Sequence, residues 1–90
     1  MTYVIAIHEI QDPEKFWGGN LDLPEGVSLH GIYPRADGAR AVCVWEGDSD
    51  DQVREIVESA AGEISRNEFF EVDASHPATT GLPASARTPA

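Results

Sequence analysis

The chain has little of several residue types that would direct it to particular classes of protein. Its single cysteine excludes an intramolecular disulfide. Only six lysines and arginines stand against 16 aspartates and glutamates, and the formal net charge of −10 at pH 7 repels phosphate backbones and anionic membrane surfaces. We therefore expect neither nucleic acid nor a membrane as a partner. The apolar start lacks the basic residues of a signal peptide, and no apolar run approaches the roughly 20 residues that cross a bilayer, which predicts a cytoplasmic protein.

Recognised catalytic motifs are also missing. The sequence contains no Ser-His-Asp pattern and no glycine-rich phosphate loop, so nothing in it indicates a hydrolase or a nucleotide-binding protein, and it leaves open whether the protein is an enzyme. Its 90 residues, 41% of them hydrophobic, suit one small domain. A domain of this size buries only about 60% of its unfolded surface, and it gains stability by burying one face against a second copy. We therefore expect a homodimer.

Hydrophobic patterning and capping signals predict six elements in the order βαββαβ. A short helix starts at the Asp12-Pro13 pair, and a longer helix follows the capping-box residues Ser49 and Gln52 and ends at Gly62. The strands are the β-rich or alternating runs at residues 3–10, 27–33, 40–46 and 67–73. Residues 74–90 are rich in Ala, Ser, Thr and Pro, and we expect them to be a tail to a domain spanning residues 1–73, either disordered or packed across a partner subunit.

This order within about 70 residues is that of the ferredoxin-like unit, an α+β fold in which two helices cover one face of a four-stranded antiparallel sheet. The other face is open, and two open faces can stack into a dimeric α/β barrel. Three polar, reactive side chains, His8, His30 and Cys43, fall inside the predicted strands, where a fold normally places hydrophobic residues. Their position is the main indication of a functional site.

The predicted hairpin places two of these side chains together. If Tyr33 pairs with Arg40, His30 lies opposite Cys43 on the face away from the helices. The odd-numbered residues of the first strand form its more apolar row and are expected to face the helices, so His8 points to the same open face. In this topology the strand of Cys43 lies between the other two, and both imidazoles would flank its thiol.

Two chemical functions fit this arrangement. Two imidazoles and a thiolate suit a soft divalent metal, so His8, His30 and Cys43 are candidate ligands of nickel or zinc. Alternatively, His8 and His30 line a pocket for a small apolar ligand together with the aromatic residues Trp45 and Tyr33. Each residue type also has an ordinary structural use, because a buried cysteine packs as a small hydrophobe and aromatic side chains fill cores and interfaces.

Residues 26–30 and 41–47, followed by a helix with an acidic cap, resemble a family of small ferredoxin-like proteins that includes nickel-binding members. The resemblance covers residues 3–73 and implies a homodimeric barrel, with metal binding in some members and no established reaction for most. His8 and Cys43 match the family's pattern of a His in the first strand and a Cys followed shortly by Glu in the third. The chain departs from the family in its short, glycine-broken first helix and in its tail.

The wider group of dimeric α/β barrels is similar in architecture and includes cofactor-free monooxygenases, isomerases and cyclases. This similarity implies His8 or His30 as a general base, with Trp45 and Tyr33 shaping the pocket. Cys43 separates the two hypotheses, because a metal site needs its thiolate and an acid–base enzyme does not.

Overall fold

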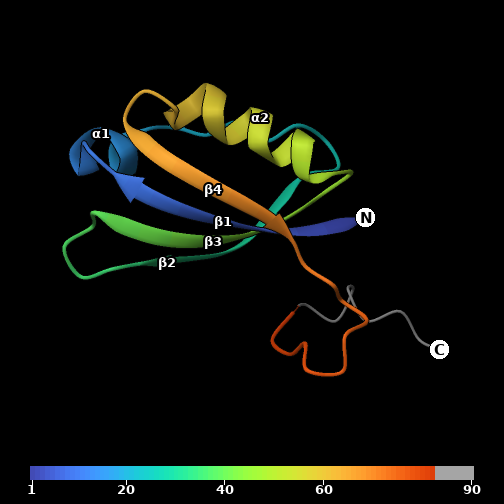
Figure 1. Cartoon of the computed structure of the whole chain (residues 1–90). Coiled ribbons are helices and arrows are strands. Elements are labelled where there is room, and N and C mark those ends of the chain that lie inside the picture. The colour runs from blue at the N-terminus through green and yellow to red at the C-terminus, as the bar shows by residue number, and fades with distance from the viewer. Residues whose placement is uncertain (83–90) are drawn as a thin grey trace.

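Four antiparallel strands form a single sheet in the order β2-β3-β1-β4, and two helices lie on one of its faces (Figure 1). The computed structural model describes residues 1–82. Along the chain the elements are β1 (Thr2–Ile10), α1 (Pro13–Gly18), β2 (Ser28–Pro34), β3 (Arg40–Gly47), α2 (Asp50–Ala61) and β4 (Ser65–Glu71). The predicted α+β class, with a four-stranded antiparallel sheet and two helices, is confirmed.

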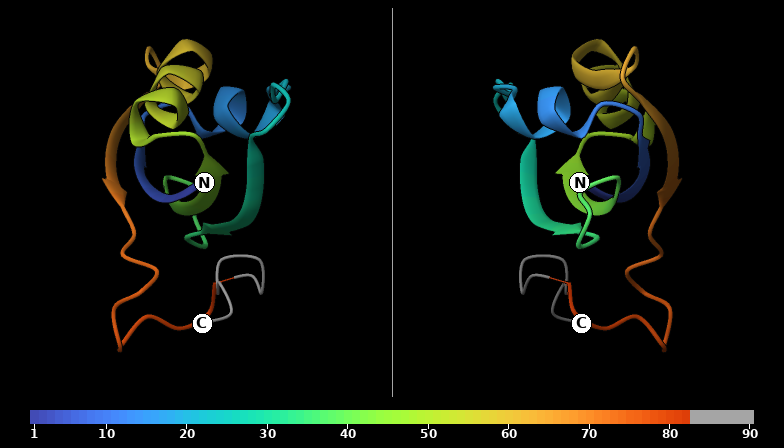
Figure 2. Two further views of the ribbon diagram at one scale, coloured as in Figure 1. Left: turned by 90° about the vertical axis from the view of Figure 1, so that its right-hand side faces the viewer. Right: turned by 90° about the vertical axis from the view of Figure 1, so that its left-hand side faces the viewer.

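The segment after β4 contains no helix or strand as far as residue 82. It leads away on the side of the sheet opposite the helices (Figures 1 and 2). The rest of the predicted tail, residues 83–90, lies outside the described residues. Within the described part of the chain, neither helix is long and apolar enough to cross a membrane.

Both helices begin at the caps that the sequence predicts. The Asp12 side chain accepts a hydrogen bond from the Lys15 backbone N–H at 3.1 Å, and Pro13 occupies the first turn of α1. At the start of α2 the Ser49 hydroxyl accepts from the Gln52 N–H at 3.1 Å, and the Gln52 side chain bonds back to the backbone N–H that precedes the cap. These local bonds satisfy N–H groups that have no partner within the helix, and so they fix where each helix starts.

The core forms between α2 and the row of β1 that was expected to face away from the helices. It consists of Val4, Ala6, Val27, Cys43, Trp45, Val53 and Val57. The prediction that the odd-numbered row of β1 faces the helices is therefore wrong. Both rows of β1 are apolar, so strand alternation alone does not distinguish them. The row with the small, fully buried Ala6 leaves room for α2 to pack closely on the sheet.

The register of the β2–β3 hairpin beside its loop differs from the predicted register by two residues. Ile32, rather than His30, lies opposite Cys43, so the prediction that His30 and Cys43 are cross-strand neighbours is wrong. The hairpin closes with a hydrogen bond of 2.7 Å from the Arg35 N–H to the Arg40 carbonyl, which makes its loop shorter than expected. Because the loop is shorter, Tyr33 pairs with Val42 instead of Arg40, and the pairs beyond it shift in the same direction.

A β-bulge in β2 determines where His30 points. The pairing shifts between Leu29 and Gly31, so one extra residue is inserted there. Leu29 and Ile32 consequently both lie on the helix side of the sheet and line the same cavity, although they are three positions apart and regular alternation would place them on opposite sides. His30 lies on the opposite side, where it contacts Glu46. The prediction from the sequence uses regular alternation along the strand, and so it does not include this change of phase.

The face of the sheet away from the helices is apolar at its centre. Its large apolar side chains, which we call the sheet-face patch, are Ile5, Ile7, Val42, Val44, Tyr33 and Phe70. The four aliphatic side chains are partly buried, whereas the two aromatic side chains are more than half exposed. An open apolar face is thus present, but with the row of β1 residues opposite to the one expected.

Candidate functional site

A cavity of about 240 Å³ lies between the sheet and the helices. Residues of β1, β2 and β3 contribute to its wall, and so do residues of α1, the loop after it and α2. Most of the wall is apolar and includes Phe16, Leu21, Leu29, Ile32, Val57 and Ile64. A few polar or reactive side chains reach it, among them His8, Cys43 and Trp45 from the strands and Lys15 from α1. This composition is typical of sites for small molecules.

His8 is buried, and a chain of hydrogen bonds holds its ring. Its Nδ1 lies 2.6 Å from the Oδ1 of Asn67, its neighbour on β4. The Asn67 Nδ2 donates to a carboxylate oxygen of Glu58 at 3.1 Å and also faces the Ser65 carbonyl. Because the amide nitrogen faces two acceptors, the amide oxygen must face His8, and Nδ1 therefore carries the imidazole proton. The Nε2 of the neutral ring keeps a free lone pair.

Burial lowers the pKa of His8, because the charged imidazolium loses hydration inside the protein. The hydrogen bond to Asn67 and the negative charge of Glu58 raise this pKa but do not outweigh burial. The ring is therefore neutral near pH 7. Phe16 of α1 packs against it, with ring centroids 5.3 Å apart. A neutral, oriented imidazole whose Nε2 can accept a proton is the arrangement expected of a general base.

Trp45 lines the same cavity and carries an unsatisfied donor. The residue is 2% exposed, and its Nε1–H has no hydrogen-bond partner among the described residues. Most buried donors are paired, since an unpaired one costs about 1–3 kcal/mol. The burial of Trp45 therefore carries a cost that no hydrogen bond from the described residues offsets.

Cys43 also reaches the cavity, next to Trp45 in the same row of β3. Burial raises the pKa of its thiol to about 11, so the thiol is protonated at neutral pH. A protonated thiol is a poor nucleophile and a poor metal ligand. In this state Cys43 contributes a small apolar surface to the wall of the cavity.

His30 and Tyr33 lie on the other face of the sheet. The Nε2 of His30 is 2.7 Å from a carboxylate oxygen of Glu46, and Tyr33 is 64% exposed. Of the four residues predicted to line a ligand pocket, the structure brings His8 and Trp45 to one cavity and places the other two outside it.

The three candidate metal ligands are not brought together. His8 and Cys43 face the helices, whereas His30 lies across the sheet from them. Within residues 1–82, no group of three or more His, Cys, Asp or Glu side chains is arranged to hold a metal ion. Nickel or zinc binding stays a prediction, and the metal content of the protein purified without a histidine tag would test it.

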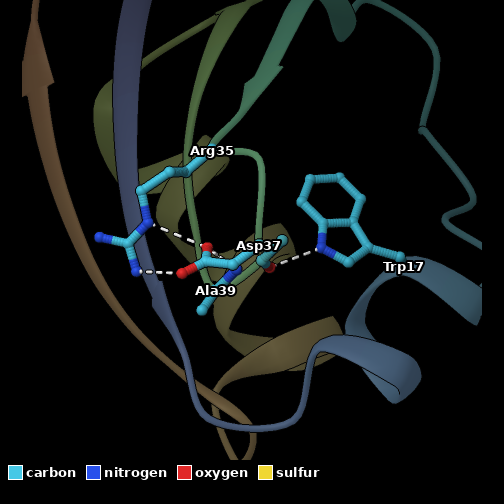
Figure 3. A network of polar contacts seen from close by, with 5 residues as sticks. Trp17, Arg35, Asp37 and Ala39 are labelled. Atoms are coloured by element: carbon cyan, nitrogen blue, oxygen red, sulfur yellow. Dashed lines mark hydrogen bonds and ion pairs between the residues drawn. The ribbon is translucent and has the colours of Figure 1, made fainter.

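A hydrogen bond fastens α1 to the β2–β3 hairpin on one side of the cavity (Figure 3). The Trp17 Nε1–H donates to the Gly38 carbonyl at 2.8 Å. The hairpin loop is itself held by Asp37, whose carboxylate accepts from the Arg35 guanidinium and from the Ala39 N–H. Gly38 has a φ of 72°, which a glycine adopts without strain. Since Trp17 also lines the cavity, this contact holds part of its wall in place.

Asn67 and Glu58 are the site residues that the sequence did not reveal. The sequence carries no clear signal for Asn67, because its row on β4 contains Ser65 and Glu71 beside Phe69 and is not apolar. Its link to His8 becomes visible only when β4 is placed beside β1. Glu58 looks like any acidic residue on the solvated face of a helix, and only the bond to Asn67 distinguishes it.

No family model matches the chain, and neither a curated protein nor a solved structure matches it. Candidate functions therefore follow from the chemistry of the cavity.

His8 is expected to titrate below its ordinary pKa of 6.5 in NMR spectra, with the His8→Gln variant identifying its signal. The unfolded chain then binds more protons than the folded protein at mildly acidic pH. The free energy of unfolding should consequently fall as pH decreases below about 6.5, and this part of the pH dependence should be absent in His8→Gln. A His8 signal that titrates above 6.5 would contradict the burial of this imidazole.

Proposed function

We propose that the protein binds a compact, largely apolar molecule in the cavity between sheet and helices, and that His8 acts on this molecule as a general base. One observation carries the proposal: a buried, neutral imidazole, oriented by Asn67, stands on the wall of an apolar cavity. Among the two functions that the sequence suggests, this arrangement supports the acid–base function.

Proton transfer is the chemistry that the geometry supports. The Nε2 of His8 takes a proton from a C–H or O–H acid of the ligand, which leaves an imidazolium and a ligand anion. Asn67 and Glu58 favour the imidazolium, because both raise the pKa of His8. A positioned base of this kind typically contributes about 10²–10⁴-fold to the rate.

We further propose that the domain is ferredoxin-like and that two copies pair through the sheet-face patch to form a dimeric barrel. The order of elements and the central position of β1 and β3 support the first part. The exposed aromatic and partly exposed aliphatic side chains of the patch support the second. A second copy is the partner we propose, because it supplies an apolar face of the same size and a short chain gains most from such burial.

Both tryptophans of the chain line the cavity, so tryptophan fluorescence reports its occupancy. A suitable probe is β-tetralone, a two-ring ketone with acidic C–H groups beside the carbonyl. We expect it to change the fluorescence saturably and to exchange these hydrogens for deuterium faster in the presence of the protein. In His8→Gln, binding should change by less than about threefold, while the protein-dependent exchange should fall by about 100-fold.

The matched control is His30→Gln, which removes an imidazole from the other face of the sheet and should leave binding and exchange unchanged. Exchange that is as fast in His8→Gln as in the original protein would reject His8 as the base. A fluorescence signal that does not respond to the probe would count against a binding cavity.

A further inference from the structure

The segment after β4 leaves the domain without packing against it. The Val72 N–H donates to the Tyr3 carbonyl at 2.8 Å, and this is the last hydrogen bond between the segment and the sheet among the described residues. Beyond it, all of residues 73–82 are exposed except Thr79 and Leu82, which are partly buried. The domain itself therefore does not hold this segment in place.

Residues 73–79 nevertheless form a set of hydrogen-bonded turns. The Asp73 carboxylate accepts from the Ser75 N–H at 3.0 Å and from the Ser75 hydroxyl at 2.7 Å, and the Thr79 hydroxyl donates to the Asp73 carbonyl at 2.6 Å. Fixing the backbone in this way costs conformational entropy, which hydrogen bonds at an exposed surface offset only in part. A shaped segment of this kind gains stability when it packs against another surface.

The segment lies on the side of the sheet that carries the sheet-face patch. From the end of β4 it runs away from the helices (Figures 1 and 2). This is the side on which we place the second copy of the chain. Residues 74–82 span up to about 30 Å when extended, and a sheet of four strands is about 15 Å across. The segment is therefore long enough to cross the sheet of a partner.

The composition of the segment suits contact with a second acidic domain. Residues 74–90 contain none of the 16 aspartates and glutamates, and they contain one of the six lysines and arginines, Arg87. The rest of the chain carries the whole acidic excess, so two copies of it repel each other. An uncharged segment that lies over the partner buries surface without adding to this repulsion. Leu82 is its only large apolar side chain and has the most to gain from such burial.

We infer that residues 74–82 of each copy extend onto the other copy and pack there as a strap on the sheet side of the dimer. This inference rests on the proposed homodimer, and it adds a contact made by exchange of these segments between the two copies. By two-fold symmetry the dimer has two such straps, and each contributes the same side chains to the interface.

Spin labelling of the full chain tests where the segment lies. Ala78→Cys places a thiol at an exposed position, whereas the buried Cys43, whose pKa is raised to about 11, should not react with a maleimide spin label. The labelled copy is mixed at low concentration with an isotope-labelled copy that lacks the spin label, so that subunits exchange. We expect strand amide signals of the isotope-labelled copy to lose intensity and to recover when ascorbate reduces the label.

The matched sample carries the spin label and the isotope in one chain, diluted into unlabelled protein. Strand amide signals should lose much less intensity there, because the strap lies on the other copy. Signal loss in neither sample, or only within the labelled chain, overturns the inference and leaves the dimer intact.

Leu82→Ala measures the contribution of the strap to association. It should raise the dissociation constant of the dimer by at least about tenfold, since it removes apolar surface from both straps. Leu23→Ala shortens an exposed leucine in the loop between α1 and β2 and should leave the dissociation constant unchanged. Equal dissociation constants for Leu82→Ala and the native protein count against the strap. A native protein that sediments as a monomer removes the proposed dimer and the strap together.

Discussion

Replacing Val53 with aspartate is expected to lower the free energy of unfolding by at least about 3 kcal/mol. Val53 lies on α2 with 0% exposure, in the core that also contains Val4 and Trp45. An aspartate at this position must either bury a charge without a partner or take up a proton, and both cost free energy. Because a domain of this size has a total stability of about 5–15 kcal/mol, the variant should lose a large part of it.

Urea unfolding followed by circular dichroism measures this loss. Ser59→Asp is the matched control, since it introduces the same side chain at an exposed position of the same helix and should cost less than about 1 kcal/mol. An unchanged unfolding midpoint for Val53→Asp would contradict the packing of α2 on the sheet.

The elements of this fold could be predicted because their signals are local. The caps at Asp12 and Ser49 each involve backbone groups within a few residues, and both form as expected. Strand β1 is recognisable from its own composition, and the turn at Gly38 from an Asp-Gly pair. Such signals need no knowledge of what packs against the segment.

The faces of the sheet could not be predicted, because they depend on packing partners far away in the sequence. In β1 both the row of Val4 and Ala6 and the row of Ile5 and Ile7 are apolar, so composition favours neither. The bulge in β2 changes the phase of the strand, so that Leu29 and Ile32 both face the helices while His30 lies on the other side. His8 and Cys43 share the helix side of the sheet and His30 lies on the other side, so the three predicted metal ligands do not meet.

The sequence therefore predicts some residues of the cavity but not their arrangement. His8 and Trp45 were both expected in a ligand pocket, and they do meet at one cavity, but on the helix-covered side of the sheet. The residues that orient His8 lie in two later segments of the chain, Asn67 on β4 and Glu58 on α2. Cavities and chains of hydrogen bonds of this kind arise from tertiary packing, and no periodic pattern in the sequence indicates them.

Replacing Val44 with glutamate is expected to raise the dissociation constant of the proposed homodimer by about 100-fold or more. Val44 lies at the centre of the sheet-face patch, opposite Ile5 on β1. In the dimer, two glutamates would have to give up their hydration in an apolar interface, which opposes association strongly. In the monomer the same position is only partly buried, so the glutamate can reach water and the fold should persist.

Sedimentation velocity across a range of concentrations distinguishes the two proteins, with Ser59→Glu on the exposed side of α2 as the control that should remain dimeric. A native protein that is monomeric at tens of micromolar, or a Val44→Glu variant as dimeric as the native protein, would contradict the proposed interface. Because the cavity lies on the helix side of the sheet and Val44 lies on the other side, the monomeric variant should still bind β-tetralone. Loss of both properties together would mean that the second copy is needed to hold the cavity in shape.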